Sequence, residues 1–177
     1  VDGIVDYLKK KNIKVFGPSK FASQLEGSKG FMKDLCKKYN IPTAKFGIFE
    51  SFEESVDFIN KNGAPIVVKA DGLAAGKGVS ICTSINEAKE KTREILEGKF
   101  QSSKKVVLEE FLEGEELSYF IVVDENSYNF FGSAQDHKRV LEGDKGKNTG
   151  GMGAYSPSRL ENKELDKKIL ERIIDPT

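Results

Sequence analysis

The stretch P-I-V-V-K-A-D-G-L-A-A-G-K-G-V-S-I-C, from Pro65 to Cys82, decides the fold of this chain. An apolar, β-branched run carries Lys69 at its end, and a second such run begins at Val79. Between them lies a loop of small residues in which Lys77 stands between two glycines. The pattern predicts a β-hairpin with a flexible, cationic tip. Because glycine backbone approaches phosphate oxygens closely and lysine supplies charge, such a hairpin is suited to cover an oligophosphate.

The spacing of the loop differs from two common nucleotide-binding motifs. A Walker loop needs four residues between its glycines, followed by Lys and Ser or Thr, and it opens a helix. Here three residues separate Gly72 from Gly76, Gly78 replaces the hydroxyl residue, and a strand follows. The dinucleotide fingerprint is also excluded, because no G-x-G-x-x-G opens a helix here. The alternative is an ordinary hairpin with a solvated lysine, for which a two-residue turn would suffice.

Composition indicates a globular protein with a charge-rich surface. The 177 residues are 38% hydrophobic and 32% charged, enough for one ordinary domain or two small ones. The 28 basic and 28 acidic residues balance, so no overall field favours nucleic acid or an anionic membrane. No apolar run approaches the ~20 residues that span a bilayer, and no secretory signal opens the chain. We therefore expect neither a nucleic-acid nor a membrane partner.

The few cysteines and the single histidine limit the site chemistry. Cys36 and Cys82 are the only cysteines and fall at apparent core positions, which predicts buried thiols in a reducing, cytoplasmic compartment. His137 is the only histidine, so multi-histidine metal sites are excluded and a Ser-His-Asp triad is disfavoured. The chain starts at Val1 without methionine and stops at Thr177 after an amphipathic run. We expect a piece excised from a longer protein.

Periodicity predicts an α+β arrangement on both sides of the hairpin. Two helices, 52–63 and 84–98, are each expected to begin with a capping box and to cover one face of the sheet. The other expected elements are a helix at 4–8, a strand at 14–16, one or two helices within 19–39, strands at 44–49, 105–110, 117–123 and 128–134, a long polar loop at 135–156, and a helix at 164–174.

Four motifs carry a resemblance to a known family. They are Q-L-E-G-S-K (24–29), K-A-D-G-L-A-A-G-K-G-V (69–79), A-Q-D-H-K-R (134–139) and N-T-G-G-M-G-A-Y-S-P (148–157). With the E-E-F-L strand end at 109–112, their order and gaps resemble the ATP-grasp superfamily, in which ATP lies between two α+β subdomains. More closely, nearly the whole chain resembles the phosphoribosylamine–glycine ligase family.

The resemblance implies an ATP-dependent ligase of de novo purine synthesis. Such an enzyme joins glycine to 5-phosphoribosylamine through a glycyl phosphate, and it releases glycinamide ribonucleotide, ADP and phosphate. The implied cofactors are ATP and Mg²⁺ or Mn²⁺, and the implied parent is a monomer, alone or fused to other purine-pathway enzymes. Three segments are implied: 1–28 ends an N-terminal domain, 29–114 is the small (lid) subdomain with its preceding helix, and 115–177 begins a second, truncated subdomain.

The resemblance also implies a set of nucleotide-binding residues. Lys69 would reach the α- and β-phosphates, Lys29 would approach from the neighbouring lobe, and Lys77 would contact the γ-phosphate. Glu109 or Glu110 would accept a hydrogen bond from the adenine amino group, although a solvated acidic turn explains this pair almost as well. The implied set is Lys29, Lys69, Gly72, Gly76, Lys77, Gly78, Glu109, Glu110, Phe111, Leu112 and Glu116. Backbone of Phe111 and Leu112 would read the adenine edge, or both would be core residues, and Glu115, Glu116 or neither would hold the ribose.

A second set of residues is implied to face the other substrates. Asp136 and Lys138 would hold phosphoribosylamine or the transferring phosphate, and with Lys69 and Lys77 they form the expected catalytic group. No catalytic role is expected of His137. The loop residues implied to bind substrate are Thr149, Gly150, Gly151, Met152 and Gly153, with a flexible linker as the alternative.

Metal ligands are implied to lie beyond Thr177, outside this chain. Phosphoryl transfer needs a metal ion between the β- and γ-phosphates, so we expect the piece alone to be inactive. Two other functions stay open. One is another ATP-grasp carboxylate–amine ligase or carboxylase, and the other is a non-catalytic nucleotide-binding module.

Overall fold

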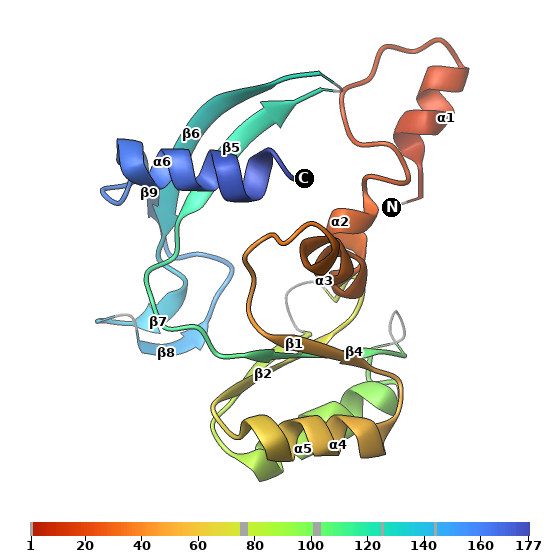
Figure 1. Ribbon diagram of the computed structural model, residues 1–177, viewed down its shortest axis with the longest axis vertical. Coiled ribbons are helices and arrows are strands. Elements are labelled where there is room, and N and C mark those ends of the chain that lie inside the picture. Colours follow the sequence, from red (N-terminus) through yellow and green to blue (C-terminus); the bar gives the residue numbers. More distant parts are fainter. Residues whose placement is uncertain (1, 75–77, 101–103, 125, 144) are drawn as a thin grey trace. The chain divides into compact units, whose positions relative to one another are not determined.

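The computed structural model describes residues 2–74, 78–100, 104–124, 126–143 and 145–177 (Figure 1). Contacts group the chain into two compact units, Val1–Leu112 and Glu113–Pro176. Helices and antiparallel strands make an α+β fold, which confirms the predicted fold class. In the described part of the chain, no helix is long and apolar enough to cross a membrane.

A four-stranded antiparallel sheet organises the first unit. Its strands, in spatial order, are β1 (Phe46–Phe49), β4 (Val106–Glu110), β2 (Ile66–Ala70) and β3 (Val79–Cys82). β2 and β3 form the predicted hairpin, with Val67 opposite Ile81 and Lys69 opposite Val79. The hairpin is therefore confirmed at its base, whereas residues 75–77 of its loop lie outside the described residues.

Two helices, α4 (Phe52–Asn62) and α5 (Ile85–Leu96), cover one face of this sheet, as the sequence predicts (Figure 1). The Ser51 and Ser84 hydroxyls begin them by accepting the backbone N–H groups of Glu54 and Glu87. The core between helices and sheet comprises Ile59, Ile66, Val68, Ala70, Cys82, Ala88, Ile95, Val106 and Leu108. Burial of each large aliphatic side chain stabilises the unit by about 1.5–3 kcal/mol, so this core fixes the hairpin base firmly.

The opposite face of the sheet meets α3 (Lys29–Lys38). A Cβ at Gly30 would lie 3.4 Å from Ile48 Cδ1, so the helix backbone approaches β1 closely. Before it come α1 (Ile4–Lys10) and the short α2 (Gln24–Gly27), which confirm the helices predicted in this region. The predicted strand at 14–16 is wrong: this segment has no regular structure, and Phe16 is 84% exposed.

The second unit has a smaller sheet, in the order β5 (Ser118–Val123), β6 (Tyr128–Asp136) and β9 (Ala154–Tyr155). Asp124 closes the predicted β5–β6 hairpin, because its Oδ1 accepts the N–H groups of Asn126 and Ser127, each at 2.8 Å. The unit ends in α6 (Lys163–Ile169) and the π-helical turn η1 (Leu170–Ile174). The predicted final helix is present, with a π-helical last turn.

The predicted long loop at 135–156 is wrong as a single loop. β6 continues to Asp136, and β7 (Arg139–Leu141) pairs with β8 (Lys145–Asn148) in a small hairpin. Gly143 adopts a φ of 69° in the turn between them, a left-handed conformation that glycine tolerates. Val140, Leu141 and Lys145 of this small hairpin are exposed, and the segment is rich in polar residues and glycine, so strand alternation is hard to detect in its sequence.

Candidate functional site

A charged cluster lies on the sheet face that α3 covers. Lys69 Nζ is 2.9 Å from Glu109 Oε1, and Lys33 Nζ is 3.0 Å from Glu109 Oε2. The side chains of Glu109 and Lys33 are 6% and 3% exposed, whereas that of Lys69 is 25% exposed. One buried carboxylate is therefore paired with two ammonium groups, of which Lys69 alone is appreciably open to solvent.

Strand alternation explains why these groups meet. In β2, Ile66, Val68 and Ala70 face the helical core, so Lys69 projects from the other face. The register places Glu109 opposite Val67, two pairs along from Lys69 opposite Val107. Lys69 and Glu109 are thus diagonal neighbours on adjacent strands, within reach of a lysine side chain.

The start of α3 is bonded to the residues that follow β2. The Lys29 ammonium donates to the Gly72 carbonyl at 2.8 Å. Asp71 Oδ1 accepts the Gly30 N–H at 3.1 Å, and the Ser28 hydroxyl lies 3.2 Å from both Asp71 carboxylate oxygens. The carboxylate thus satisfies a backbone donor at the helix N-terminus, where negative charge is favourable. Lys29 and Gly72, both predicted site residues, are brought together at the root of the hairpin loop.

The other predicted nucleotide-binding residues have different surroundings. Glu110 Oε1 accepts the Lys45 N–H at 2.8 Å, so Glu109 and Glu110 have separate partners. Phe111 is partly buried and Leu112 is 64% exposed, just after β4. Gly78 is buried, and a Cβ there would lie 2.6 Å from Ala74 Cβ. Gly76 and Lys77 lie outside the described residues, and Glu116 belongs to the second unit.

The predicted substrate residues of the second unit gather around Lys138. Its Nζ lies 2.9 Å from Glu116 Oε2 and 3.7 Å from Asp136 Oδ2. Hydrogen bonding to the Glu116 carboxylate raises the pKa of Lys138 above its ordinary value. All three side chains are 30–73% exposed, so this is a solvated cluster in which an ion pair contributes little to stability. Lys138 is thus cationic and accessible.

The predicted 149–153 loop folds back onto this cluster. The Thr149 N–H and hydroxyl both donate to the Lys138 carbonyl, at 2.7 and 2.9 Å. His137 exchanges two backbone bonds with the loop, donating to the Gly153 carbonyl and accepting the Met152 N–H. The Gly151 N–H donates to Thr149 Oγ1 at 3.1 Å, and its φ of 124° suits glycine. The loop therefore has a defined backbone path beside Asp136 and Lys138.

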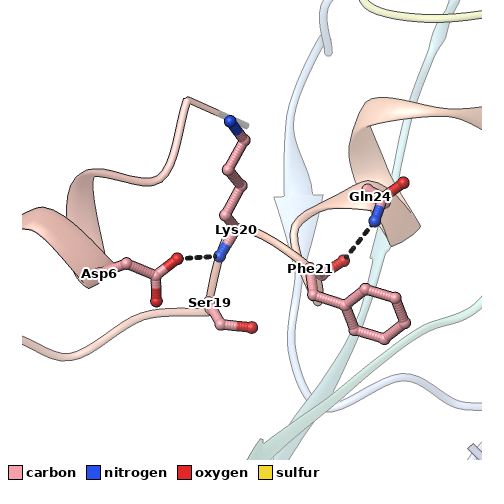
Figure 2. Close-up of a pocket in the computed structure, with 5 residues that line it drawn as sticks. All are labelled: Asp6, Ser19, Lys20, Phe21 and Gln24. Atoms are coloured by element: carbon pink, nitrogen blue, oxygen red, sulfur yellow. Dashed lines mark hydrogen bonds between the residues drawn. The ribbon is translucent and has the colours of Figure 1, made fainter.

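One hollow of the first unit contains none of the predicted site residues (Figure 2). It is lined by Asp6, Ser19, Lys20, Phe21 and Gln24. Asp6 Oδ2 accepts the Lys20 N–H at 2.7 Å, and the Gln24 amide donates to the Phe21 carbonyl at 3.3 Å (Figure 2). These polar groups hold the turn before α2, which is a structural role.

Metal-ligating residues do not cluster in the part of the chain that the structure describes. No three His, Cys, Asp or Glu residues gather there to hold a metal ion. The described residues therefore do not fit a protein-built metal cage.

The sequence prediction missed Lys33 and its partner Thr43. Lys33 Nζ donates to Thr43 Oγ1 at 2.6 Å in addition to its ion pair with Glu109. A signal was present, because Lys33 shares the buried stripe of α3 with Gly30 and Cys36 at a spacing of three residues. A lysine on an apolar stripe needs a buried partner.

Comparison with known proteins places this geometry in a family. Residues 27–177 match the family model described as "Phosphoribosylglycinamide synthetase, ATP-grasp (A) domain". The whole chain is 52% identical to the phosphoribosylamine–glycine ligase of Mesorhizobium japonicum and 54% identical to the chloroplastic phosphoribosylamine–glycine ligase of Arabidopsis thaliana. It spans 42% and 34% of the length of these relatives.

A solved structure agrees with the sequence comparison. The phosphoribosylamine–glycine ligase of Thermotoga maritima superimposes on 92% of this chain and 41% of its own, with a TM-score of 0.82 and 42% identity. The matched residues 27–177 include the charged cluster, the hairpin and the 134–157 segment. The chain therefore belongs to the phosphoribosylglycinamide synthetase family, with residues 27–177 matching its ATP-grasp (A) domain.

Proposed function

We propose that this chain is the nucleotide-binding segment of a ligase that joins glycine to 5-phosphoribosylamine with ATP. The supporting observation is the cluster of Lys69, Glu109 and Lys33 beside the glycine-rich hairpin, in a family whose named relatives are phosphoribosylamine–glycine ligases. In this proposal, residues 29–114 serve as the small ATP-grasp subdomain and residues 115–177 begin the second one.

The nucleotide is proposed to bind through the first unit. Lys69 presents a partly exposed ammonium beside the loop glycines, an arrangement that fits an oligophosphate. Lys29 holds the loop root through Gly72 and is proposed to approach the nucleotide from there. Glu109 or Glu110 is proposed to accept a hydrogen bond from the adenine amino group, although Glu109 Oε1 is buried and lies 2.9 Å from Lys69 Nζ. Gly78, Glu110, Phe111 and Leu112 complete the proposed contacts of this unit, together with Gly76 and Lys77.

The second unit is proposed to hold the other substrates. Lys138 and Asp136 bind phosphoribosylamine or the phosphoryl group in transit, while Glu116 keeps Lys138 charged and positioned. The N–H groups of Thr149, Gly151 and Met152 bond within the unit, so the backbone of Gly150 and Gly153 is proposed to add the loop's donors for phosphate. ATP supplies the phosphoryl group that activates the glycine carboxylate. The protein supplies positioning, charge stabilisation and exclusion of water, and it needs no covalent nucleophile.

Divalent metal is part of the proposal, as Mg²⁺ or Mn²⁺ bound with the phosphates. The ligands are proposed to lie outside the described residues, which form no cluster of metal-ligating side chains. We also propose a cytoplasmic, monomeric protein that acts on small molecules. The two buried free cysteines agree with a reducing compartment.

Replacing Lys69 by alanine in the full-length protein tests the phosphate role. We expect kcat/KM for ATP to fall by about 100-fold, as for loss of one charge-stabilising group in an active site. Lys61→Ala, at an exposed position on α4, is the matched control and should leave ATP kinetics unchanged. Wild-type ATP kinetics in the Lys69 variant, measured by steady-state ADP release, would refute this role.

The acceptor is tested separately, by the dependence of ADP release on each substrate. Release that requires both glycine and phosphoribosylamine supports the proposed ligase. Release that instead requires bicarbonate would assign the site to a carboxylase of the same fold. Nucleotide binding without any substrate-dependent ADP release would assign it to a nucleotide-binding module.

A further inference from the structure

The proposed nucleotide site contains a second buried lysine, Lys33, in addition to the ion pair between Glu109 and Lys69. Glu109 bridges two ammonium groups, Lys33 on the buried side and Lys69 on the open side. Lys33 is 3% exposed and its ammonium also donates to Thr43 Oγ1. Phe46 flanks it, with the ring centre 5.5 Å from Nζ. Lys33 therefore has a fixed, desolvated position that no ligand reaches directly.

The summed charge of Lys33, Lys69 and Glu109 suggests what the buried lysine does. With Lys33 present, two positive charges and one negative charge leave a net charge of +1. Without Lys33, the net charge would be zero. Lys69 would then be the only counterion of the buried Glu109 carboxylate. Because Lys33 is enclosed and Lys69 is 25% exposed, the net positive charge is available to a ligand at Lys69.

We propose that Lys33 is a positioning residue for nucleotide phosphate, which neutralises Glu109 so that the charge of Lys69 remains available to the ligand. This inference rests on the proposed nucleotide site, and it extends that site to a residue on α3 that touches no ligand. It predicts that Lys33 sets the preference for phosphorylated over unphosphorylated nucleosides. Lys33 is not expected to affect the affinity for the adenosine portion, which other groups bind.

The test compares the affinities of ADP and adenosine, measured by isothermal titration calorimetry on the full-length protein. Lys33→Met removes the charge and shortens the unbranched side chain by only one atom. We expect it to weaken ADP by about 10- to 100-fold, as typically follows loss of a group that orients a ligand-contacting residue, and to change adenosine affinity little. Lys37→Met is the control, one helical turn away on the same helix and exposed.

A charge ladder separates this role from simple packing. Glu109→Gln raises the cluster charge to +2, and the double variant Lys33→Met with Glu109→Gln restores +1. The expected order of the ADP-to-adenosine preference is therefore Glu109→Gln, then wild type and the double variant together, then Lys33→Met. Any loss of an adenine contact at Glu109 affects both ligands and cancels in this ratio.

Each outcome decides the question. Equal weakening of ADP and adenosine by Lys33→Met shows a packing role and overturns the proposal, as does an unchanged preference. If thermal unfolding shows that Lys33→Met is not folded, the test uses wild type, Glu109→Gln and the double variant. A preference in the double variant that matches wild type and lies below that of Glu109→Gln supports the proposal, and any other order overturns it.

An independent test of the proposed site precedes this one. If wild-type protein fails to bind ADP, the proposed function fails. If wild-type protein binds ADP but the variants do not follow the expected order of ADP-to-adenosine preference, the nucleotide site stands and only the proposed role of Lys33 fails.

Discussion

Cys82 shows how burial sets the chemistry of a single residue. Its thiol lies in the core beneath α5 with no exposed surface, and burial raises its pKa to about 11, with a further contribution from Glu87. The thiolate is the reactive form of cysteine. This cysteine is therefore inert in the folded protein at neutral pH, which agrees with a packing role.

The same shift predicts how stability depends on pH. Below pH 9.0 the thiol is protonated in both the folded and the unfolded states, so its contribution is constant. Between pH 9.0 and about 11 the unfolded thiol loses its proton first, so stability falls as pH rises. The loss is at most about 2–3 kcal/mol, from 1.36 kcal/mol for each pKa unit.

Urea unfolding of wild type and Cys82→Ala across this pH range measures the effect. The alanine variant loses packing equally at every pH, so the stability difference between the two proteins should shrink as pH rises. Other groups that titrate above pH 9.0 are common to both proteins and cancel. A stability difference that stays constant with pH would contradict a raised Cys82 pKa.

Single residues also show where sequence reasoning about the site stops. Lys69 was predictable because it ends an apolar strand next to a glycine-rich loop. Lys33 was signalled only by its place on the buried stripe of α3, and its partner Glu109, 76 residues away in the chain, reaches it only when α3 packs on the sheet. The stripe indicates that Lys33 needs a buried partner, but the carboxylate that pairs with it is determined only in the folded molecule.

At the scale of elements, the β2–β3 hairpin depends on a close approach at Gly78. A Cβ at this position would lie 2.6 Å from Ala74 Cβ and 3.2 Å from Ala70 Cβ. The residue cannot easily shift away, since its carbonyl accepts the Ala70 N–H at 2.7 Å. The glycine is therefore required by space at the root of the loop.

Gly78→Ala should destabilise the chain by about 1–3 kcal/mol through overpacking. It should also raise KM for ATP in the full-length protein, because the loop root that carries the proposed phosphate contacts is displaced. Gly150→Ala is the control for stability: a Cβ added there would meet nothing within 4 Å, and the φ of Gly150 is outside the left-handed region. Chemical denaturation measures both variants, and equal stability of the two would show that the Gly78 contact relaxes without cost.

Elements were predictable where local and long-range signals agree. The hairpin has β-branched strands, and α4 and α5 have both capping boxes and apolar stripes that pack on one core. The segment at 14–16 has only a short β-like composition, and a strand also needs a partner for its backbone groups. No described strand pairs with it. The β7–β8 hairpin was missed for the opposite reason: its strands pair, but the apolar side chains of Val140 and Leu141 are exposed and leave no buried alternation in the sequence.

For the molecule as a whole, the two units differ in how much apolar surface they bury. Every hydrophobic residue that is buried in the described structure belongs to the first unit, from Val5 to Leu108. Among the described residues of the second unit only Ser133 and Ser158 are buried, while β5 and β6 carry exposed apolar side chains such as Phe120 and Phe131. Burial of apolar surface is the main source of folding stability, so the proposed adenine and phosphate contacts lie on the more stable unit.

Native-state hydrogen exchange should therefore separate the two units. Amides of β2 and β4 should exchange only through global unfolding, because their strands lie in the middle of the core. Amides of β5 and β6 should exchange through local opening at lower free energy, with stronger protection near Ser133, whose hydroxyl accepts the Ser158 N–H and bonds Glu161. Measurement on the 177-residue chain by NMR or mass spectrometry resolves this. Equal protection of β2 and β5 would show that the two units unfold as one cooperative body.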